Sequence, residues 1–406
     1  MLSGLRNLIV SNPRYSAIRE FLLPPGCQGA RRTIKKLFNL YLARLEEMRG
    51  RIQLRSYPIK LTLEATNVCN LRCPACYTGV GDLGRPRSSM SLELYRKVLA
   101  ELGDYLFEIE FCNWGEPLLS KYICTMIKEA AERGISTTIA SNFSIPFDAE
   151  KAERLVSAGL TVLGVSIDGA RQESYEKYRV KGNLETVLRN CRLVADAKKK
   201  LRSKTPQLVW SFHVFEHNVG DIELAKAMAK ELEMDLSILK GWVEGAEWNP
   251  EGEWRFFGDP TVGRCPFLWK FAVVNNDGGV APCCGTFFRE DDMGKIAVSP
   301  EDLAVSTFKE VWNGPKFQAA RGFYRSRVGS DETRKLICFD CPKTVIYENW
   351  KKHRAAGGTR DSFEVGCTTN DSFNFFWNRR RVHSETRKST SSHVTRTQSS
   401  RNAAGS

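Results

Sequence analysis

The segment from Glu64 to Cys76 reads EATNVCNLRCPAC and places Cys69, Cys73 and Cys76 directly after a run of residues that predicts a β-strand. Three thiolates this close together suit an iron–sulfur cluster or zinc. A structural zinc site needs four protein ligands, and the sequence has no fourth Cys or His close by. A cubane cluster held by three ligands leaves one iron open for chemistry. The loop therefore predicts a reactive cluster rather than structural zinc.

Strand-like and helical runs alternate around and beyond this loop. Strands are expected at Ile59–Ala65, Phe107–Cys112, Ser136–Ala140, Thr161–Ile167, Leu208–Phe215 and Leu236–Leu239. Amphipathic helices are expected at Leu92–Leu102, Tyr122–Arg133, Ala149–Ala158, Leu184–Lys200 and Asp221–Leu232. This alternation predicts an α/β fold with a parallel sheet and right-handed crossovers. Six such units fit a partial (β/α)6 barrel of the TIM type, with the cysteine loop at its C-terminal mouth.

The Cys-x3-Cys-x2-Cys loop after a first barrel strand resembles that of the radical S-adenosylmethionine (SAM) superfamily. Two positions depart from the family pattern. Ala75 stands where an aromatic residue usually packs near the adenine, and Trp114 stands where a glycine is usual. Tyr77 or Trp114 is expected to make the adenine contact instead. The resemblance implies that the three cysteines hold a [4Fe-4S] cluster that binds SAM.

Later strand ends carry further matches to this superfamily. Gly115, Glu116 and Pro117 form its Gly-Glu-Pro segment, which implies that they hold the SAM amino group. The resemblance also implies a ribose contact by Asn142 and carboxylate contacts by Ser166 and Arg179, with Asp168 in the same stretch. From the residues alone, ordinary alternatives stay open: a turn residue for Asn142, a helix cap for Asp168 and a surface cation for Arg179.

A second set of cysteines comprises Cys265, Cys283, Cys338 and Cys341. A glycine turn between Phe271–Asn275 and Val280–Ala281 predicts a hairpin that brings Cys283 back beside Cys265. The layout resembles the SPASM/twitch extension of radical SAM enzymes, which implies one auxiliary [4Fe-4S] cluster. Zinc on the same four thiolates is the alternative, and Cys284 could replace Cys283. The other cysteines are expected to be inert thiols: Cys27, Cys112, Cys124, Cys191 and Cys367.

The resemblance implies a radical SAM oxidoreductase. An electron from a flavodoxin or ferredoxin would cleave SAM, and the resulting 5′-deoxyadenosyl radical would abstract hydrogen from a small polar metabolite such as a sugar or aminocyclitol. The auxiliary cluster would accept the electron of the substrate radical. Two alternatives are a SPASM-type maturase that modifies a peptide or protein side chain, and a non-enzymatic metal-binding scaffold. His213 and Glu216 are weak candidates for a catalytic acid or base, and a structural role for His213 competes with that role.

The formal net charge of +13 belongs to the ends of the chain. Residues 1–55 carry 11 Lys/Arg and 3 Asp/Glu, residues 351–406 carry 11 and 4, and the remainder has a net charge of −2. A nucleic-acid groove through the body is therefore not expected. No apolar run approaches the length of a membrane span, and no secretory signal stands out. With its clustered cysteines, the chain is predicted to be cytoplasmic.

Composition divides the chain into four regions: a helical extension (1–55), a radical SAM core barrel (56–250), a SPASM/twitch domain (251–350) and a basic tail predicted to be disordered (351–406). The extension is expected to form two helical pieces broken at Pro24-Pro25-Gly26. The second piece, from about Arg32 to Arg49, places Leu37, Tyr41 and Leu45 on one face. We expect this helix to pack on the main domain rather than on a membrane surface.

Overall fold

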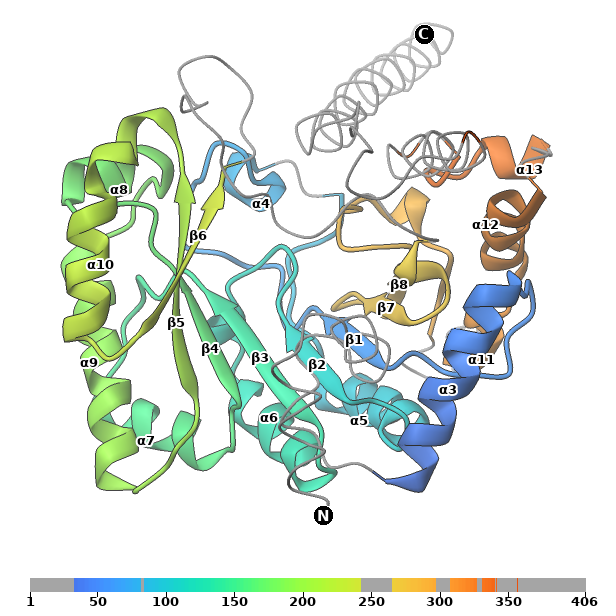
Figure 1. Ribbon diagram of the computed structural model, residues 1–406, viewed down its shortest axis with the longest axis horizontal. Helices are drawn as coiled ribbons and strands as arrows, with labels where there is room; N and C mark the ends of the chain where they lie inside the picture. Colours follow the sequence, from blue (N-terminus) through green and yellow to red (C-terminus); the bar gives the residue numbers. More distant parts are fainter. Residues whose placement is uncertain are drawn as a thin grey trace, which may run out of the picture.

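A single nine-stranded sheet runs through the protein in the spatial order β6-β5-β4-β3-β2-β1-β7-β8-β9 (Figure 1). The computed structural model describes residues 33–81, 84–241, 265–296, 307–326, 331–339, 341 and 356. Strands β1 to β6 are parallel and comprise Lys60–Leu63, Glu108–Phe111, Ser136–Ser141, Val162–Ser166, Gln207–Val214 and Asp235–Lys240. Each strand boundary lies within two residues of its predicted position, and the expected partial barrel is confirmed.

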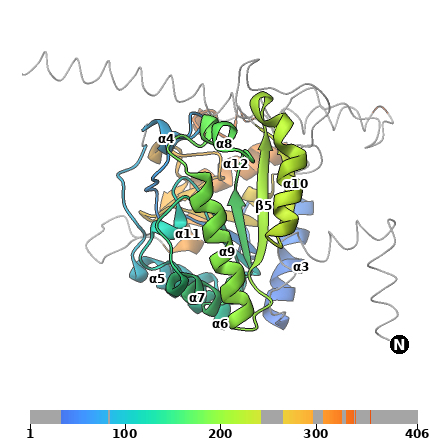
Figure 2. The same ribbon diagram turned by 90° about the vertical axis from the view of Figure 1, so that its left-hand side faces the viewer.

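Helices connect these strands and cover the outer side of the sheet (Figures 1 and 2). They are α5 (Leu92–Leu102), α6 (Ile123–Glu132), α7 (Ala149–Ser157), α8 (Gln172–Tyr178), α9 (Leu184–Lys200) and α10 (Ile222–Glu231). Helices α5 and α9 have the predicted bounds because their first turns are capped. Ser91 Oγ accepts from the Leu94 N–H at 3.1 Å, and Asn183 Oδ1 accepts from the Thr186 N–H at 2.7 Å.

The two faces of β1 and β2 differ in polarity. The residues that pack with α5 and α6 in the main core are Leu61, Leu63, Ile109 and Phe111. Because successive strand residues point to opposite faces, the residues between them line the concave side of the sheet: Lys60, Thr62, Glu108 and Glu110. The lumen of the partial barrel is therefore polar beside these two strands.

Strand β1 also pairs with β7 (Phe271–Val274), in parallel and on its other edge. The predicted hairpin follows, with β8 (Gly279–Ala281) antiparallel to β7 and β9 (Gly294–Lys295) antiparallel to β8. Gly278 takes a φ of 87° in the turn, a conformation that favours glycine. The hairpin thus extends the barrel sheet beyond β1.

The C-terminal part of the structure packs beside this hairpin as α11 (Phe308–Trp312), α12 (Pro315–Ser326) and α13 (Asp331–Arg334). Arg321 on α12 is fully buried. Its guanidinium donates to the carbonyl oxygens of Leu268 at 2.6 Å, Trp312 at 2.7 Å and Ile52 at 3.1 Å. One side chain therefore ties α12 to α11, to the entry of β7 and to the segment that precedes β1.

Helix α3 (Ile34–Arg49) packs on the barrel through a mixed face that buries Leu40 and Ala43 together with Lys36, Asn39 and Glu46. The Asn39 side chain donates to the Tyr57 carbonyl at 3.0 Å and accepts from the Tyr57 N–H at 2.8 Å. Glu46 accepts from the backbone N–H groups of Arg55 and Ser56 at 2.8 and 3.1 Å, and from Ser56 Oγ at 2.6 Å. The hydrogen bonds of Asn39 and Glu46 to backbone groups therefore hold much of this interface.

The apolar face of α3 points the other way. The sequence grouped Leu37, Tyr41 and Leu45, and we expected this helix to pack on the main domain. The helix does pack there, but the side chains of Leu37 and Tyr41 are 44% and 60% exposed. Periodicity identifies an apolar face, but it does not reveal that the polar face has buried hydrogen-bond partners.

Several expectations fall outside the described residues. They are the helical piece before Pro24, the boundary near residue 250, the tail after residue 356, and the thiols Cys27 and Cys367. Within the described part of the chain, no helix has the length and hydropathy needed to cross a membrane.

Glu46→Ala should lower the free energy of unfolding by about 2–3 kcal/mol, because it removes a buried charged acceptor and leaves two N–H groups without a partner. Met48→Ala on the outer face is the matched control, with an expected change within about 0.5 kcal/mol. Urea denaturation of both variants measures the difference. Equal losses would contradict the polar attachment of α3.

Candidate functional site

The first three cysteines lie together in the loop after β1. Cys73 is buried and Cys69 and Cys76 are partly buried, and all three have free thiols. Burial raises the pKa of the Cys69 thiol to about 12 and that of Cys73 to about 11. They share a small apolar cluster with Leu71, Ala75, Tyr178 and Phe215. Three thiols lie near one another in a single loop, and this donor set fits an iron–sulfur cluster.

Gly115 and Glu116 bring the end of β2 against this loop. A Cβ on Gly115 would overlap the Thr66 carbonyl, so the close approach requires glycine. The buried Glu116 carboxylate accepts from Ser141 Oγ at 2.8 Å and from the Asn142 N–H at 2.7 Å. Burial raises the pKa of Glu116 to about 7, although these hydrogen bonds lower it. Glu116 therefore joins the ends of β2 and β3.

Asn142 reaches the cysteine loop from the end of β3. Its Nδ2 donates to Asn70 Oδ1 at 3.1 Å and lies 3.7 Å from Cys69 Sγ. Its Oδ1 accepts from the Ser144 N–H at 2.9 Å. Asn142 thus forms the expected turn and also contacts the first thiol.

Asp168 and Arg179 form a buried pair between the cysteine loop and β5. Arg179 Nε donates to Asp168 Oδ2 at 2.6 Å, and the fully buried carboxylate also accepts from the His213 N–H at 2.8 Å. Burial alone would raise the pKa of Asp168, but Arg179 and His213 outweigh it and hold the pKa at about 2. The Arg179 charge also lowers the pKa of Cys73 relative to the effect of burial. Arg179 is therefore a cation beside the first thiol set rather than a surface residue.

The two weak acid–base candidates have different surroundings in the structure. His213 Nδ1 lies 3.0 Å from Asp168 Oδ1, at the end of β5. Glu216 begins the 3-10 helix η4 (Glu216–Asp221) and is exposed. Ser166 ends β4 in register with Ser211 of β5 and is partly buried. His213 therefore makes the kind of contact expected of a structural histidine, which was the alternative to a catalytic role.

Aromatic rings connect the first cysteine loop with the segment after β8. Tyr77, at the start of α4 (Tyr77–Val80), stacks on Phe287 with ring centroids 5.3 Å apart and meets Trp114 edge-on at 4.9 Å. Trp114 Nε1 donates to the Thr286 carbonyl at 3.1 Å. Both aromatic residues that were candidates for the adenine contact are thus engaged with the 286–288 segment.

The second set of cysteines also assembles. Cys265 precedes η6 (Pro266–Leu268), Cys283 follows β8, and Cys338 and Cys341 follow α13. These four residues line a cavity of about 30 Å³ together with Leu268, Pro282, Tyr324 and Ile337. In the part of the chain that is described, no three His, Cys, Asp or Glu side chains converge tightly enough to hold one metal ion directly. The thiols surround a space, and an all-cysteine donor set suits an iron–sulfur cluster.

The choice between Cys283 and Cys284 has a geometric basis. Cys283 lines the cavity, and its thiol interacts electrostatically with the thiols of Cys265, Cys338 and Cys341. The Cys284 thiol interacts electrostatically with Glu110 instead. The thiol of Cys112, which follows β2, interacts with both Cys284 and Glu110. Adjacent residues after a strand point in different directions, so only one of the two thiols faces the cavity.

A buried arginine joins the two cysteine-bearing regions. Arg85, from the segment that follows the first loop, donates to Asp292 Oδ1 at 2.5 Å and to Asp277 Oδ1 at 3.1 Å. Its Nε donates to the Phe287 carbonyl at 3.0 Å. The Arg85 side chain is 1% exposed, so this charge is compensated almost entirely by protein groups.

Sequence reasoning missed a charged network in the lumen. Lys60 Nζ lies 3.2 Å from Glu110 Oε2 and 3.4 Å from Glu108 Oε2. Thr138 Oγ1 donates to Glu108 Oε1 at 3.1 Å. The available signal was charged residues at alternate positions of strands that belong to a buried parallel sheet, where apolar runs are the norm.

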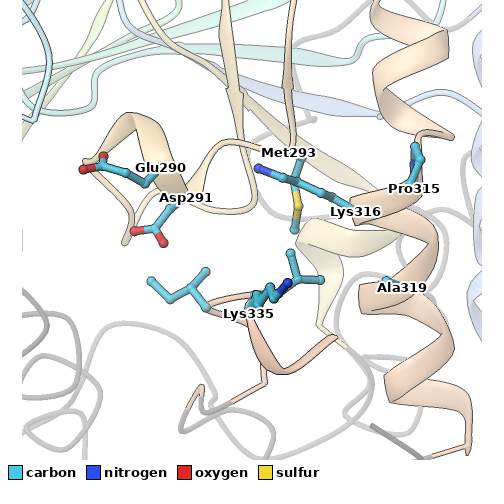
Figure 3. Close-up of a pocket in the computed structure, with 9 residues that line it drawn as sticks. Glu290, Asp291, Met293, Pro315, Lys316, Ala319 and Lys335 are labelled. Carbon is cyan, nitrogen blue, oxygen red and sulfur yellow. The ribbon is translucent and has the colours of Figure 1, made fainter. Parts of the chain in front are cut away.

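A larger cavity, of about 310 Å³, lies outside both thiol sets (Figure 3). Glu290 and Asp291 of η7 (Arg289–Asp291) form one side of it, and Lys316 and Lys335 lie across from them (Figure 3). Ile337 lines this cavity and also the smaller cavity with the thiols. The larger space therefore borders the second thiol set from outside, and no sequence motif marked it.

Family models match both parts of the chain. The model described as the radical SAM superfamily matches residues 63–228, and an iron–sulfur cluster-binding domain model matches residues 265–342. The two matches contain the two cysteine sets.

Individual relatives match shorter segments. Fe-coproporphyrin III synthase of Methanosarcina barkeri is 32% identical over 130 residues, which is 31% of this chain and 32% of that protein. PqqA peptide cyclase of Bradyrhizobium diazoefficiens is 28% identical over 129 residues, 32% of this chain and 33% of that protein. The matched segments thus span about a third of the length of these curated relatives.

A solved structure has the same fold. SuiB of Streptococcus suis, bound to its precursor peptide SuiA, superposes with a TM-score of 0.53 at 13% identity and covers 71% of each chain.

Arg85→Ala should lower the free energy of unfolding by about 3–5 kcal/mol, because it leaves the largely buried Asp292 carboxylate without its paired cation and removes one of the two cations that pair with Asp277. Arg289→Ala is the matched control. Arg289 also contacts Asp277, at 2.8 Å, but is 52% exposed, so a loss of about 1 kcal/mol or less is expected. Chemical denaturation compares the variants, and similar losses would rule out Arg85 as the central link.

Proposed function

Because the chain belongs to the radical SAM superfamily and carries its SPASM-type iron–sulfur domain, we propose that it is a radical SAM oxidoreductase that acts on a polar substrate held in the barrel lumen. One observation carries the proposal. Cys69, Cys73 and Cys76 follow β1, and Cys283 of the second set follows β8 of the same sheet, while the charged residues Lys60 and Glu110 lie on the concave side of β1 and β2.

In this proposal Cys69, Cys73 and Cys76 hold a [4Fe-4S] cluster. When bound with SAM, this group supplies reductive cleavage of SAM and a 5′-deoxyadenosyl radical that abstracts hydrogen from the substrate. Leu71, Ala75, Tyr178 and Phe215 give these thiols apolar surroundings. Asn142, with an N–H directed at Cys69, stabilises negative charge on that sulfur.

The residues around this loop are assigned to SAM. The Arg179 guanidinium, next to Cys73, offers the cation that a carboxylate requires. Ser166 and Asp168 belong to the same strand end, where Asp168 orients Arg179. Gly115, Glu116 and Pro117 would hold the SAM amino group, and Asn142, whose backbone N–H donates to Glu116, would contact the ribose.

Cys265, Cys283, Cys338 and Cys341 are assigned to one auxiliary [4Fe-4S] cluster. Four protein ligands leave no open iron, so electron transfer is the role that this donor set favours. Acceptance of an electron from the substrate radical gives a net oxidation of the substrate. The region from residue 251 to 350 is proposed to act as this auxiliary-cluster domain, and residues 56–250 as the core barrel.

Two substrate classes are compatible with the lumen. Lys60 and Glu110 can bind the hydroxyl, amino or acidic groups of a small polar metabolite, such as a sugar or aminocyclitol. A peptide side chain is the second candidate, favoured by the PqqA peptide cyclase match and by the fold shared with SuiB bound to SuiA. Deuterium transfer from labelled substrates of both classes into 5′-deoxyadenosine distinguishes them.

The proposed reaction requires a reducing compartment and an electron donor. We therefore assign the enzyme to the cytoplasm, with a flavodoxin or ferredoxin as the partner that reduces the cluster. The enzymatic assignment replaces the non-enzymatic scaffold considered from the sequence, because the matched relatives are enzymes.

After anaerobic reconstitution with iron and sulfide, the protein should convert SAM to 5′-deoxyadenosine and methionine in the presence of dithionite. Chromatography with mass detection measures the product. A variant with alanine at Cys69, Cys73 and Cys76 should form none above background while keeping the signal of the auxiliary cluster. No 5′-deoxyadenosine from the reconstituted wild-type protein would refute the proposed function.

Cys283→Ala and Cys284→Ala should differ although the residues are adjacent. Cys283→Ala removes a thiol that faces the cavity and should cut the reconstituted iron content by roughly half, since one of two [4Fe-4S] clusters is lost. Cys284→Ala should keep its iron. Iron and sulfide analysis with electron paramagnetic resonance provides the readout, and the reverse pattern would assign Cys284 as the ligand.

A further inference from the structure

Helix α3 presents an exposed apolar stripe on its outer face. Ile34, Phe38, Tyr41, Met48 and Leu37 are 89%, 64%, 60%, 58% and 44% exposed. They are half of the exposed large hydrophobic residues in the described part of the chain, and the other five, scattered over other elements, are only 37–41% exposed. Single exposed apolar residues are ordinary, but a cluster of this kind indicates a contact surface.

The helix cannot roll to bury this stripe. Its opposite face is fixed by the buried hydrogen bonds of Asn39 and Glu46, and Lys36 Nζ donates to the Gly134 carbonyl at 2.9 Å. A rotation would leave these polar groups without partners, at a cost for each buried group. The outward direction of the stripe is therefore a property of the folded state.

The charge around the stripe is positive. Residues 33–55 carry six Lys/Arg and two Asp/Glu, a net charge of +4, and the two carboxylates of α3 are engaged by the protein itself. Glu46 caps the backbone at Arg55 and Ser56, and Glu47 pairs with Lys270 at 2.8 Å. Arg49, Arg51 and Arg55, at and beyond the end of the helix, are exposed. An occupant of this surface must therefore accept both apolar side chains and cations.

We propose that α3 binds the surface of an anionic phospholipid bilayer, with its apolar stripe between the headgroups. Interfacial helices combine an apolar face, aromatic residues and basic flanks in this way. The stripe from Ile34 to Met48 is about 21 Å long and about 10 Å wide, or about 200 Å². This area is well below the roughly 800 Å² per partner of a stable protein interface, which favours lipid over a second protein.

The proposed contact leaves the site accessible. Helix α3 packs against residues at the beginnings of strands, among them Ile59, Phe107 and Phe271, whereas Cys69, Cys73 and Cys76 follow the end of β1. A bilayer at α3 thus faces the N-terminal end of the barrel. The inference goes beyond the proposed function and does not depend on the clusters.

Sedimentation with vesicles tests the proposal on the full chain. We expect the wild-type protein to bind phosphatidylcholine vesicles that contain roughly 30% phosphatidylglycerol, and to bind pure phosphatidylcholine vesicles weakly. The Phe38→Gln/Tyr41→Gln variant should bind the anionic vesicles at least about tenfold more weakly. Leu201→Gln/Leu224→Gln, which removes two exposed apolar side chains elsewhere, should bind like the wild type. Unchanged circular dichroism and 5′-deoxyadenosine formation would show that both variants are folded.

Hydroxyl-radical footprinting identifies the occupant. Phe38, Tyr41 and Met48 should be oxidised in the lipid-free protein and protected by anionic vesicles. Protection without lipid would overturn the proposal, because residues 1–32 or a second copy would then cover the stripe, and light scattering would distinguish these two cases. Failure of the wild type to bind vesicles, or equal binding by the Phe38→Gln/Tyr41→Gln variant, would also overturn it.

Discussion

The parallel pairing of β1 on both of its edges is the constraint on which the rest of the molecule depends. β1 pairs with β2 on one side and with β7 on the other. Because parallel neighbours end at the same edge of a sheet, the cysteine loop after β1 emerges at the same edge as the ends of β2 and β7. Without the β1–β7 pairing, no sheet would fix the positions of the two cysteine-bearing regions relative to one another.

Side chains reinforce this frame where the strands end. Asn113 Nδ2 donates to Asn275 Oδ1 at 3.0 Å, which connects the ends of β2 and β7. Arg85 adds a buried ionic link, and Tyr77 and Trp114 add aromatic contacts with Phe287. The loop thus lacks an aromatic residue at Ala75, and the nearby rings of Tyr77 and Trp114 pack at the junction between the two regions.

Much of the fold was predictable because its signals are local. Six strands, the helices between them and the β7–β8 hairpin follow from periodicity, caps and a glycine turn. The cysteine sets were predictable from spacing, since ligands close in sequence leave a visible pattern. The lumen network of Lys60, Glu108 and Glu110 was missed because its members come from two strands 48 residues apart in register, and no motif connects them.

The sequence by itself determined the residue types, the order of the strands and the apolar stripe of α3. Only the tertiary structure decided which face of α3 packs on the barrel, because the partners of Asn39 and Glu46 are backbone groups that any sequence would supply. It also decided that Cys283 rather than Cys284 faces the other thiols, since the two residues lie in the turn after β8 and their directions depend on how that turn is placed. The pairing of β7 with β1 is likewise long-range, and its hydrogen bonds use backbone atoms that carry no sequence signal.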